Sequence, residues 1–291
     1  MRKQLYFLCT LFFAFNFLYS QPGSKSQHRC KEEDISKYTS YKIASAPTID
    51  GRLDEKVWAT ASASNKFVDL ISGAQTALDT RAAVLWDDQY LYVGFWIEEP
   101  NITAKLTERD APIYQDNDVE FFIAGPDGYY EFEINSFGTI YEVLFFWSDV
   151  YDKKGYSAKP EFKRDGPGAK IFNGVGYRHP RGSRIGFWKW DMPGLKSAVH
   201  IDGTINNDKD KDKGWTVEIA IPWSSLKILA DADGRALPPK NNDEWRMDFS
   251  RFNQKKYSES DSGGWAWSSH GVWDSHVPEC YTRIQFVEKG E

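Results

Sequence analysis

The stretch D-V-E-F-F-I-A-G-P-D-G-Y-Y-E-F-E-I-N, residues 118–135, decides the fold. Two runs rich in aromatic and β-branched residues, 118–124 and 129–135, flank the connection Gly-Pro-Asp-Gly. Such runs are typical of strands, and Gly, Pro and Asp are typical of the turn between two strands. The pattern therefore predicts a β-hairpin.

Polar residues alternate with apolar ones in both runs. Successive side chains of a strand point to opposite faces of its sheet. Asp118 and Glu120 therefore share one face of the first strand. Glu131, Glu133 and Asn135 share one face of the second. If the strands pair, these faces join into one surface of carboxylates and an amide, which can exchange hydrogen bonds with sugar hydroxyls. A solvated outer face of an antiparallel sheet would show the same pattern, so both interpretations stay open.

Similar segments extend along the rest of the chain. Residues 80–87 and 90–97 flank Asp88-Gln89 and predict a second hairpin. Further strands are expected at 139–147, 184–190, 195–201, 214–221, 244–252 and 281–287. Only two short helices are expected, at 53–60 and 223–229. The connections at 101–115, 148–182, 202–213 and 230–243 are long, which is common for functional loops. This pattern predicts an all-β fold, an antiparallel, jelly-roll-like β-sandwich with long loops.

The N-terminus resembles a targeting segment. Arg2 and Lys3 precede the apolar run 5–18, which is shorter than the ~20 residues that span a bilayer. We expect a signal peptide at 1–20, a polar N-terminal arm at 21–38 and one sandwich domain at 39–291, with an uncleaved anchor as the alternative for the first segment. The protein would then be secreted, periplasmic or on the cell surface. No later segment is apolar enough to span a membrane.

The composition of the chain limits the classes of ligand that it is expected to bind. The net charge of -6 argues against nucleic acid, whose phosphates favour a basic surface. Aromatic residues make up 16% of the chain, and Trp and Tyr offer apolar faces with a polar edge, which suits a sugar ring. Most of these rings could equally fill the core.

Cys30 and Cys280 would form a disulfide in an oxidising compartment, or remain two thiols. The oligomeric state is not indicated.

Five phrases occur in an order that resembles the family 9 carbohydrate-binding modules and the family-9-like proteins of exported bacterial polysaccharide systems. They are I-D-G-R-L-D-E-K-V-W (49–58), W-D-D-Q-Y-L-Y (86–92), D-V-E-F-F-I (118–123), G-W-T-V-E-I-A-I-P-W (214–223) and H-V-P-E (276–279). The resemblance covers about residues 41–287. It implies a β-sandwich that grips the end of a sugar chain between two aromatic rings, with calcium bound elsewhere and a role in carbohydrate catabolism.

The resemblance also implies positions for the ligand contacts. Tyr114 and Trp273 stand where the family has its two rings. Glu120 and Asn135 stand at the positions of an acid and an amide that contact the sugar. Glu133 occupies a place where the family can carry a basic sugar-contacting residue, which puts that contact in doubt.

Single residues suggest further contacts to a sugar or to a metal ion. Arg251 ends a predicted strand and could bracket sugar hydroxyls with its planar guanidinium, or pair with a neighbouring acid. Asp50, Asp87 and Asp88 lie at predicted turns, where they could bind calcium as in family relatives or cap the turn. Calcium is the one cofactor that these positions suggest.

Two further functions remain as alternatives. Glu120 and Glu133 could form the carboxylate pair of a glycoside hydrolase, or of an accessory subunit of one. However, no nucleophile, metalloprotease or phosphate-loop motif is present, and we predict no catalytic residue. Related sandwiches bind haem, for which Met192 and the histidines are the available axial ligands.

Overall fold

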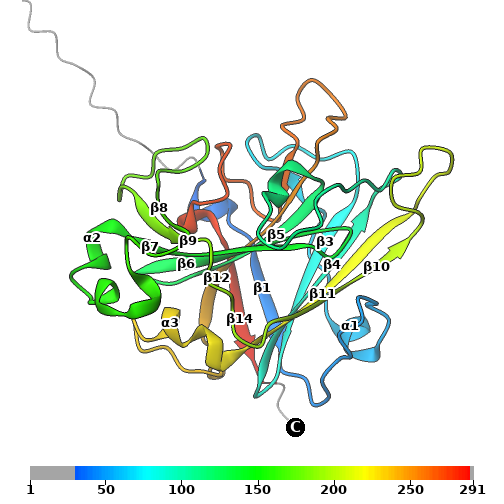
Figure 1. Ribbon diagram of the computed structural model, residues 1–291. Helices are drawn as coiled ribbons and strands as arrows, with labels where there is room; N and C mark the ends of the chain where they lie inside the picture. The colour runs from blue at the N-terminus through cyan, green and yellow to red at the C-terminus, as the bar shows by residue number, and fades with distance from the viewer. Residues whose placement is uncertain (1–29, 289–291) are drawn as a thin grey trace, which may run out of the picture.

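Two β-sheets pack against each other in the computed structural model, which describes residues 30–288 (Figure 1). The larger sheet has the path β1-β14-β12-β5-β6-β7-β9-β8, with β13 and β2 joined beside β12, and the smaller has the order β10-β11-β4-β3. The strands of the larger sheet are β1 (Lys37–Tyr41), β2 (Val68–Asp69), β5 (Asp118–Ala124), β6 (Gly128–Asn135), β7 (Ile140–Trp147), β8 (Ala169–Phe172), β9 (Arg184–Phe187), β12 (Glu244–Phe252), β13 (Gly264–Ala266) and β14 (Thr282–Val287). Those of the smaller sheet are β3 (Thr80–Trp86), β4 (Tyr90–Glu98), β10 (Lys196–Asp202) and β11 (Gly214–Pro222).

Helices are short and lie in the connections. The α-helices are α1 (Lys56–Thr60), α2 (Ser148–Tyr151) and α3 (Lys227–Ala230). The 3₁₀ turns are η1 (Glu32–Asp34), η2 (Ile113–Gln115), η3 (Tyr156–Ala158), η4 (Pro160–Phe162), η5 (Trp223–Leu226) and η6 (Pro278–Cys280). Among residues 30–288, no helix has the length and apolar character needed to cross a membrane.

The predicted β-sandwich is confirmed, and the predicted strands are present with small shifts at their ends. Four short strands were not predicted: β1, β2, β8 and β13. One pair also departs from the antiparallel pattern, because β1 runs parallel to β14. β2, β8 and β13 have only two to four residues, and β1 (K-Y-T-S-Y) has few apolar side chains.

The two predicted hairpins set the register of the sheets. In the hairpin predicted at 80–97, β3 pairs with β4 so that Trp86 faces Leu91. In the hairpin predicted at 118–135, β5 pairs with β6, and Glu120 lies directly opposite Glu133. Strand β7, which corresponds to the strand expected at 139–147, pairs with the far side of β6.

The core lies between the two sheets. Val119 and Phe121 of β5 and Phe132 of β6 belong to it, together with Val93 and Phe95 of β4. Since side chains alternate along a strand, the acidic positions of β5 and β6 lie on the other face of the larger sheet. The site is therefore built on the outer face of this sheet.

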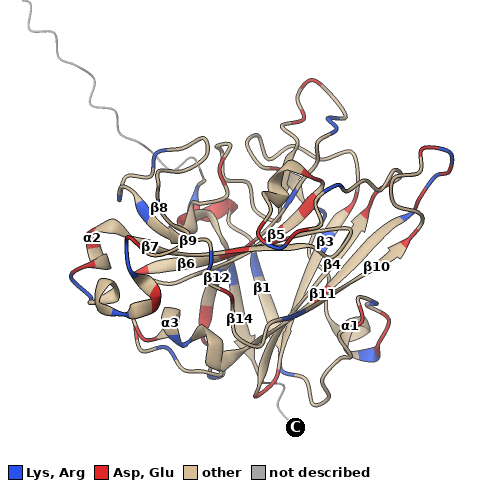
Figure 2. Ribbon diagram, viewed as in Figure 1, with Lys and Arg blue, Asp and Glu red and all other residues tan. Residues whose placement is uncertain are grey.

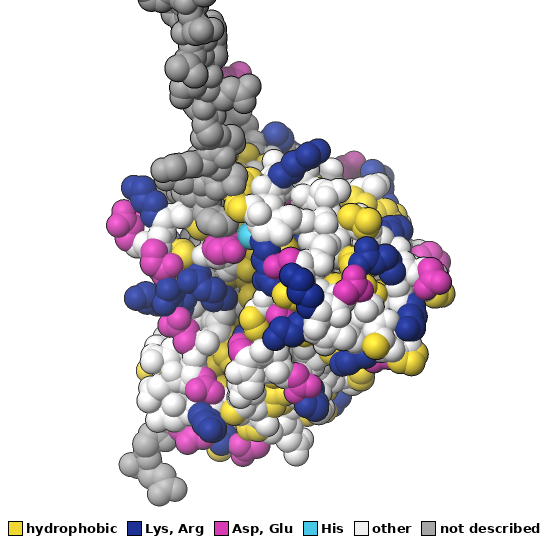
Figure 3. All heavy atoms as spheres, turned by 90° about the vertical axis from the view of Figure 1, so that its left-hand side faces the viewer, with side chains coloured by type: hydrophobic (Ala, Val, Ile, Leu, Met, Phe, Trp, Pro, Cys, Tyr) yellow, Lys and Arg dark blue, Asp and Glu magenta, His cyan; other side chains and the backbone are white. Residues whose placement is uncertain are grey.

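Charged residues of both signs are interspersed over the surface. Figure 2 shows acidic and basic residues together at the tip of the β10–β11 loop. Figure 3 shows the same mixture on the left-hand side of Figure 1, with hydrophobic atoms between the charges. Such interspersed charges are typical of a solvated surface.

The two ends of the described chain meet. Cys30 forms a disulfide with Cys280, and β1 then runs beside β14. Residues 37 and 38 of the predicted polar arm are thus part of the sandwich. The predicted signal peptide and the rest of the arm up to residue 29 lie outside the described residues.

Removing this disulfide tests its share of the stability. The double substitution Cys30→Ser with Cys280→Ser breaks a link across 250 residues of sequence. We expect the free energy of unfolding to fall by about 3–5 kcal/mol, because the unfolded chain regains the entropy that a long closed loop denies it. Urea unfolding followed by fluorescence measures the change, and the reduced wild-type protein should behave like the variant. Equal unfolding free energies for oxidised wild type and variant would contradict this role.

Candidate binding site

A cavity of about 540 Å³ opens on the outer face of β5, β6 and β7. The β8–β9 loop and the connection from β13 to β14 rise on one side of the larger sheet (Figure 1). Residues of both segments line the cavity. Its polar lining consists of Glu120, Glu131, Glu133, Lys170, Asp274, Ser275 and His276. Its apolar lining consists of Tyr114, Tyr141, Phe145, Ile171, Phe172, Val175, Trp188, Phe252 and Trp273.

Exposed hydrophobic side chains gather at this cavity. Of the large hydrophobic residues that remain exposed within residues 30–288, all except Phe137 line the cavity or the hollow beside it. They are Ile71, Tyr114, Ile171, Val175 and Trp273. Because an exposed apolar cluster costs solubility, a soluble chain that retains one usually uses it for binding.

The two rings named from the family resemblance lie in this one cavity. Tyr114, in η2, is 50% exposed, and its ring meets Tyr141 edge-on at a centroid distance of 6.0 Å. Trp273 is 37% exposed, and its ring meets Phe252 edge-on at 5.2 Å. A ring of the sheet therefore supports each of these two rings, while much of its own surface stays open to a ligand.

The floor carries the acids that strand alternation predicted. Glu120 and Glu133 are both cavity-lining and only 5% and 2% exposed. With Asp118, which is fully buried, they bring one oxygen each to within 4.8 Å of one another. The acidic face is therefore not a solvated outer surface, because the loops above the sheet cover it.

Burial and mutual repulsion raise the pKa values of these acids. Desolvation, with the charge of Asp248 adding to it, raises the pKa of Glu120 to about 8. Desolvation and the neighbouring carboxylates raise the pKa values of Asp118, Glu131 and Glu133 well above the usual range. Two like charges about 4.8 Å apart repel by roughly 3 kcal/mol at an effective dielectric constant of about 20. The floor therefore favours protons, or a cation, over bare carboxylates.

Neighbouring basic groups do not balance this charge. Burial lowers the pKa of His276 to about 3, so its ring is neutral; Nδ1 lies 3.1 Å from the Tyr129 hydroxyl. Arg184 is buried and donates from Nε to the same hydroxyl at 2.8 Å. Its guanidinium also lies 4.9 Å from the ring centre of Phe172.

Asp274 joins the two loops that cover the sheet, a role that the sequence did not reveal. Its Oδ2 accepts hydrogen bonds from the backbone N–H groups of Val175, Gly176 and Tyr177, at 2.8, 3.2 and 3.1 Å. Gly176 packs so closely that a Cβ there would lie 2.3 Å from the carbonyl oxygen of Trp273. The β8–β9 loop is thereby fixed to the segment that presents Trp273. Because these partners are nearly a hundred residues apart, no local pattern could indicate the contact.

Asn135, predicted to contact the sugar, is occupied within the fold. It is fully buried, and its Nδ2 donates to the carbonyl of Leu106 at 2.8 Å and to Asp116 at 3.0 Å. Its Oδ1 accepts from the N–H groups of Phe137 and Thr139. Asn135 therefore holds the β6–β7 turn and does not line the cavity.

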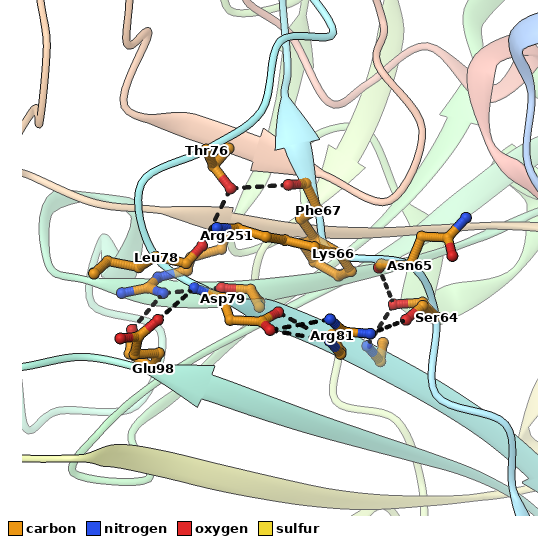
Figure 4. Close-up of polar contacts among 12 residues, drawn as sticks. Ser64, Asn65, Lys66, Phe67, Thr76, Leu78, Asp79, Arg81, Glu98 and Arg251 are labelled. Atoms are coloured by element: carbon orange, nitrogen blue, oxygen red, sulfur yellow. Dashed lines mark hydrogen bonds and ion pairs between the residues drawn. The ribbon is translucent and has the colours of Figure 1, made fainter.

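Arg251 points the other way, into the space between the sheets. It is fully buried and donates to the hydroxyl of Thr80 and the carbonyl of Glu98, each at 2.9 Å (Figure 4). It also forms an ion pair of 3.2 Å with Glu99. Of the two interpretations of Arg251, the structure thus shows the pairing with an acid, and it separates the guanidinium from the cavity by the sheet itself.

The three predicted calcium candidates have turn or surface partners instead. Asp50 accepts a hydrogen bond from the N–H of Arg52. Asp87 accepts from the N–H groups of residues 89 and 90, which caps the β3–β4 turn. Asp88 forms an ion pair of 2.7 Å with Lys42. The structure does not bring these acids into one group.

Comparisons with known proteins agree with this fold. Residues 49–155 match the family model described as carbohydrate family 9 binding domain-like, which confirms the resemblance. A crystal structure of a candidate carbohydrate-binding protein from Bacteroides uniformis aligns at 12% identity with a TM-score of 0.55, over 87% of this chain and 99% of that one. It shows a common fold. No curated protein matches the chain.

Two further solved structures are family 9 modules from Caldicellulosiruptor kristjanssonii. The one in complex with cellotriose aligns at 14% identity, over 88% of this chain and 96% of that one, with a TM-score of 0.48. The one in complex with glucose aligns at 13% identity, over 87% and 97%, with a TM-score of 0.46.

The role of Asp274 can be tested by local exchange. In Asp274→Ala, the amides of residues 175–177 lose their buried acceptor, which should cost about 1–3 kcal/mol. We expect hydrogen exchange in a peptide spanning 173–178 to become faster, while the control Glu259→Ala, an exposed loop acid, leaves it unchanged. Unaltered exchange in Asp274→Ala would show that the loop is held by other contacts.

Proposed function

We propose that this chain is an exported, non-catalytic carbohydrate-binding protein whose cavity takes the end of a sugar chain. One observation carries the proposal: two exposed rings, Tyr114 and Trp273, line the same cavity as the buried carboxyl groups of Glu120 and Glu133. The match of residues 49–155 to a carbohydrate-binding domain family supports the ligand class.

The chemistry of the cavity suits a pyranose. The ring of such a sugar has apolar C–H faces, which pack on aromatic rings, and a rim of hydroxyl groups. Tyr114 and Trp273 supply the aromatic surface, and carboxyl groups on the floor can accept or, when protonated, donate hydrogen bonds to the rim. A volume of about 540 Å³ lies within the usual range for small-molecule sites.

Export fits two features of the chain. The segment 1–20 has the composition of a signal peptide. The Cys30–Cys280 disulfide is the kind of bond that persists outside the reducing cytosol. We therefore place the protein in the periplasm, on the cell surface or outside the cell, where it would serve polysaccharide catabolism.

Hydrolysis is the second candidate because one specific observation favours it. Glu120 and Glu133 lie side by side with raised pKa values, as the proton-donating acid of a glycosidase requires. However, both carboxyl groups lie on the floor, whereas a glycosidase places its two acids on either side of the scissile bond.

The haem alternative has less support. Met192 is buried in the core between the sheets, whereas His276 lines the cavity on the outer face. The structure does not bring these two candidate axial ligands together.

Substitution of the exposed tryptophan tests the proposal. We expect Trp273→Ala to weaken binding to the preferred glycan at least about 30-fold, or about 2 kcal/mol, because an anchoring ring is lost. Phe137→Ala is the matched control, since Phe137 is the exposed ring that lies away from the cavity. Affinity gel electrophoresis measures binding, and thermal melting checks the fold. If Trp273→Ala binds like wild type, or unfolds, the ring does not act as a sugar platform.

An assay for released reducing sugar separates binding from hydrolysis. We expect no release above background when the wild-type protein is incubated with the glycan it binds. Release that Glu120→Gln abolishes would instead establish a hydrolase and overturn the non-catalytic proposal.

A further inference from the structure

We propose that the carboxylates of Asp118, Glu120 and Glu133 bind one calcium ion at the floor of the cavity. This site differs from the turn positions to which the family resemblance pointed. The ion itself does not depend on sugar binding. A contact between the ion and a sugar rests on the proposed function.

The strand geometry fixes the three ligands. Asp118 and Glu120 are two residues apart on β5, so their side chains share the outer face. Glu133 lies directly opposite Glu120 on β6. One carboxylate oxygen from each residue lies within 4.8 Å of the others. Since Ca–O distances are about 2.3–2.6 Å, a single ion can reach all three.

The unpartnered carboxylate oxygens of this group are suitable ligands for a cation. Oδ2 of Asp118 and Oε2 of Glu133 are buried and have no hydrogen-bond partner. The residues themselves are 0% and 2% exposed. Buried polar atoms nearly always have a partner, and two orphaned carboxylate oxygens in one group of acids call for a positive ligand.

No lysine or arginine binds these three acids directly within residues 30–288. Arg251 of β12 is on the opposite face and paired with Glu99. Arg184 of β9 donates to Tyr129, and Lys170 of β8 lies over the ring of Trp188 at 5.3 Å.

The other charged groups near the three acids are mostly carboxylates. Glu131 of β6 and Asp248 of β12 act on Glu120 or its neighbours as further carboxylates. His270 contacts Asp248 at 3.2 Å, and His276 lies 3.4 Å from Glu131. Both rings therefore pair with these two acids and not with Asp118, Glu120 or Glu133. Ser250 donates to Glu120 at 3.3 Å. The three acids therefore lie among further carboxylates.

The type and arrangement of the ligand atoms favour calcium over other metal ions. All three ligands are oxygens, which suits hard cations rather than zinc or copper. Three carboxylates can supply up to six oxygens in an irregular arrangement, which calcium accepts, whereas magnesium demands a near-ideal octahedron and retains waters. Glu120 and Glu133 also line the cavity, so the ion would have an open side toward it. There, two vicinal sugar hydroxyls could complete the coordination.

The ion is tested without any sugar. Chelator-treated full-length protein is titrated with CaCl₂ by calorimetry, and with Tb³⁺ by luminescence sensitised through nearby aromatic rings. We expect one saturable ion per chain, displaced from Tb³⁺ by calcium but not by an equal concentration of magnesium. Asp118→Asn and Glu133→Gln, which preserve shape, should each lower calcium affinity at least tenfold with an unchanged circular dichroism spectrum.

Asp88→Asn is the matched control, because it removes an acid that pairs with Lys42 and does not line the cavity, and it should retain wild-type calcium affinity. No calcium binding, or wild-type affinity in both cavity variants, would overturn the proposed site. Loss of binding in Asp88→Asn alone would place calcium at the turn and likewise overturn it.

The link to sugar is measured separately. Glycan affinity of the wild type should fall at least tenfold when calcium is chelated, and Asp118→Asn should show the lower affinity even with calcium present. Calcium binding with unchanged glycan affinity would overturn the ion–sugar contact alone. Glycan binding without any calcium binding would overturn the ion and leave the proposed function standing.

Discussion

The register between β5 and β6 is the constraint on which the rest of the structure depends. Because side chains alternate along a strand, one pairing sends Val119 and Phe121 into the core and places Glu120 opposite Glu133 on the outer face. A slip of one residue would move those acids between the sheets, into the hydrophobic core. The hydrophobic core therefore determines, at the same time, where the acids of the cavity stand.

The cavity needs a second constraint, which comes from the loops. An outer sheet face that carries acids would normally be solvated, yet here the loops desolvate it and raise the acids' pKa values. Asp274 makes this cover rigid by binding three backbone N–H groups of the β8–β9 loop. The free energy lost by burying carboxyl groups is recovered only if protons, a cation or a ligand meets them. The burial of these acids is therefore one reason for proposing that the cavity binds a ligand.

Strand alternation predicted the hairpins and the shared face of Glu120 and Glu133, because both follow from local pattern. The same alternation could have shown that Arg251 faces the core. Met247 and Phe249 of the same strand point into the core, and Arg251 follows Phe249 by two residues. The burial of the acids and the role of Asp274 could not be predicted, because they depend on contacts between distant loops. Tyr114 and Trp273 came from the family resemblance, as nothing local distinguishes them from core rings.

The central claim is that this cavity binds a carbohydrate. Calorimetry of the protein beginning at Gln21 against a panel of glycans, with calcium present, tests it most directly. The account predicts saturable binding to one class of sugar, with one ligand per chain. A flat panel from a folded protein would contradict it and would mean that the sandwich retains the rings and acids without a sugar site.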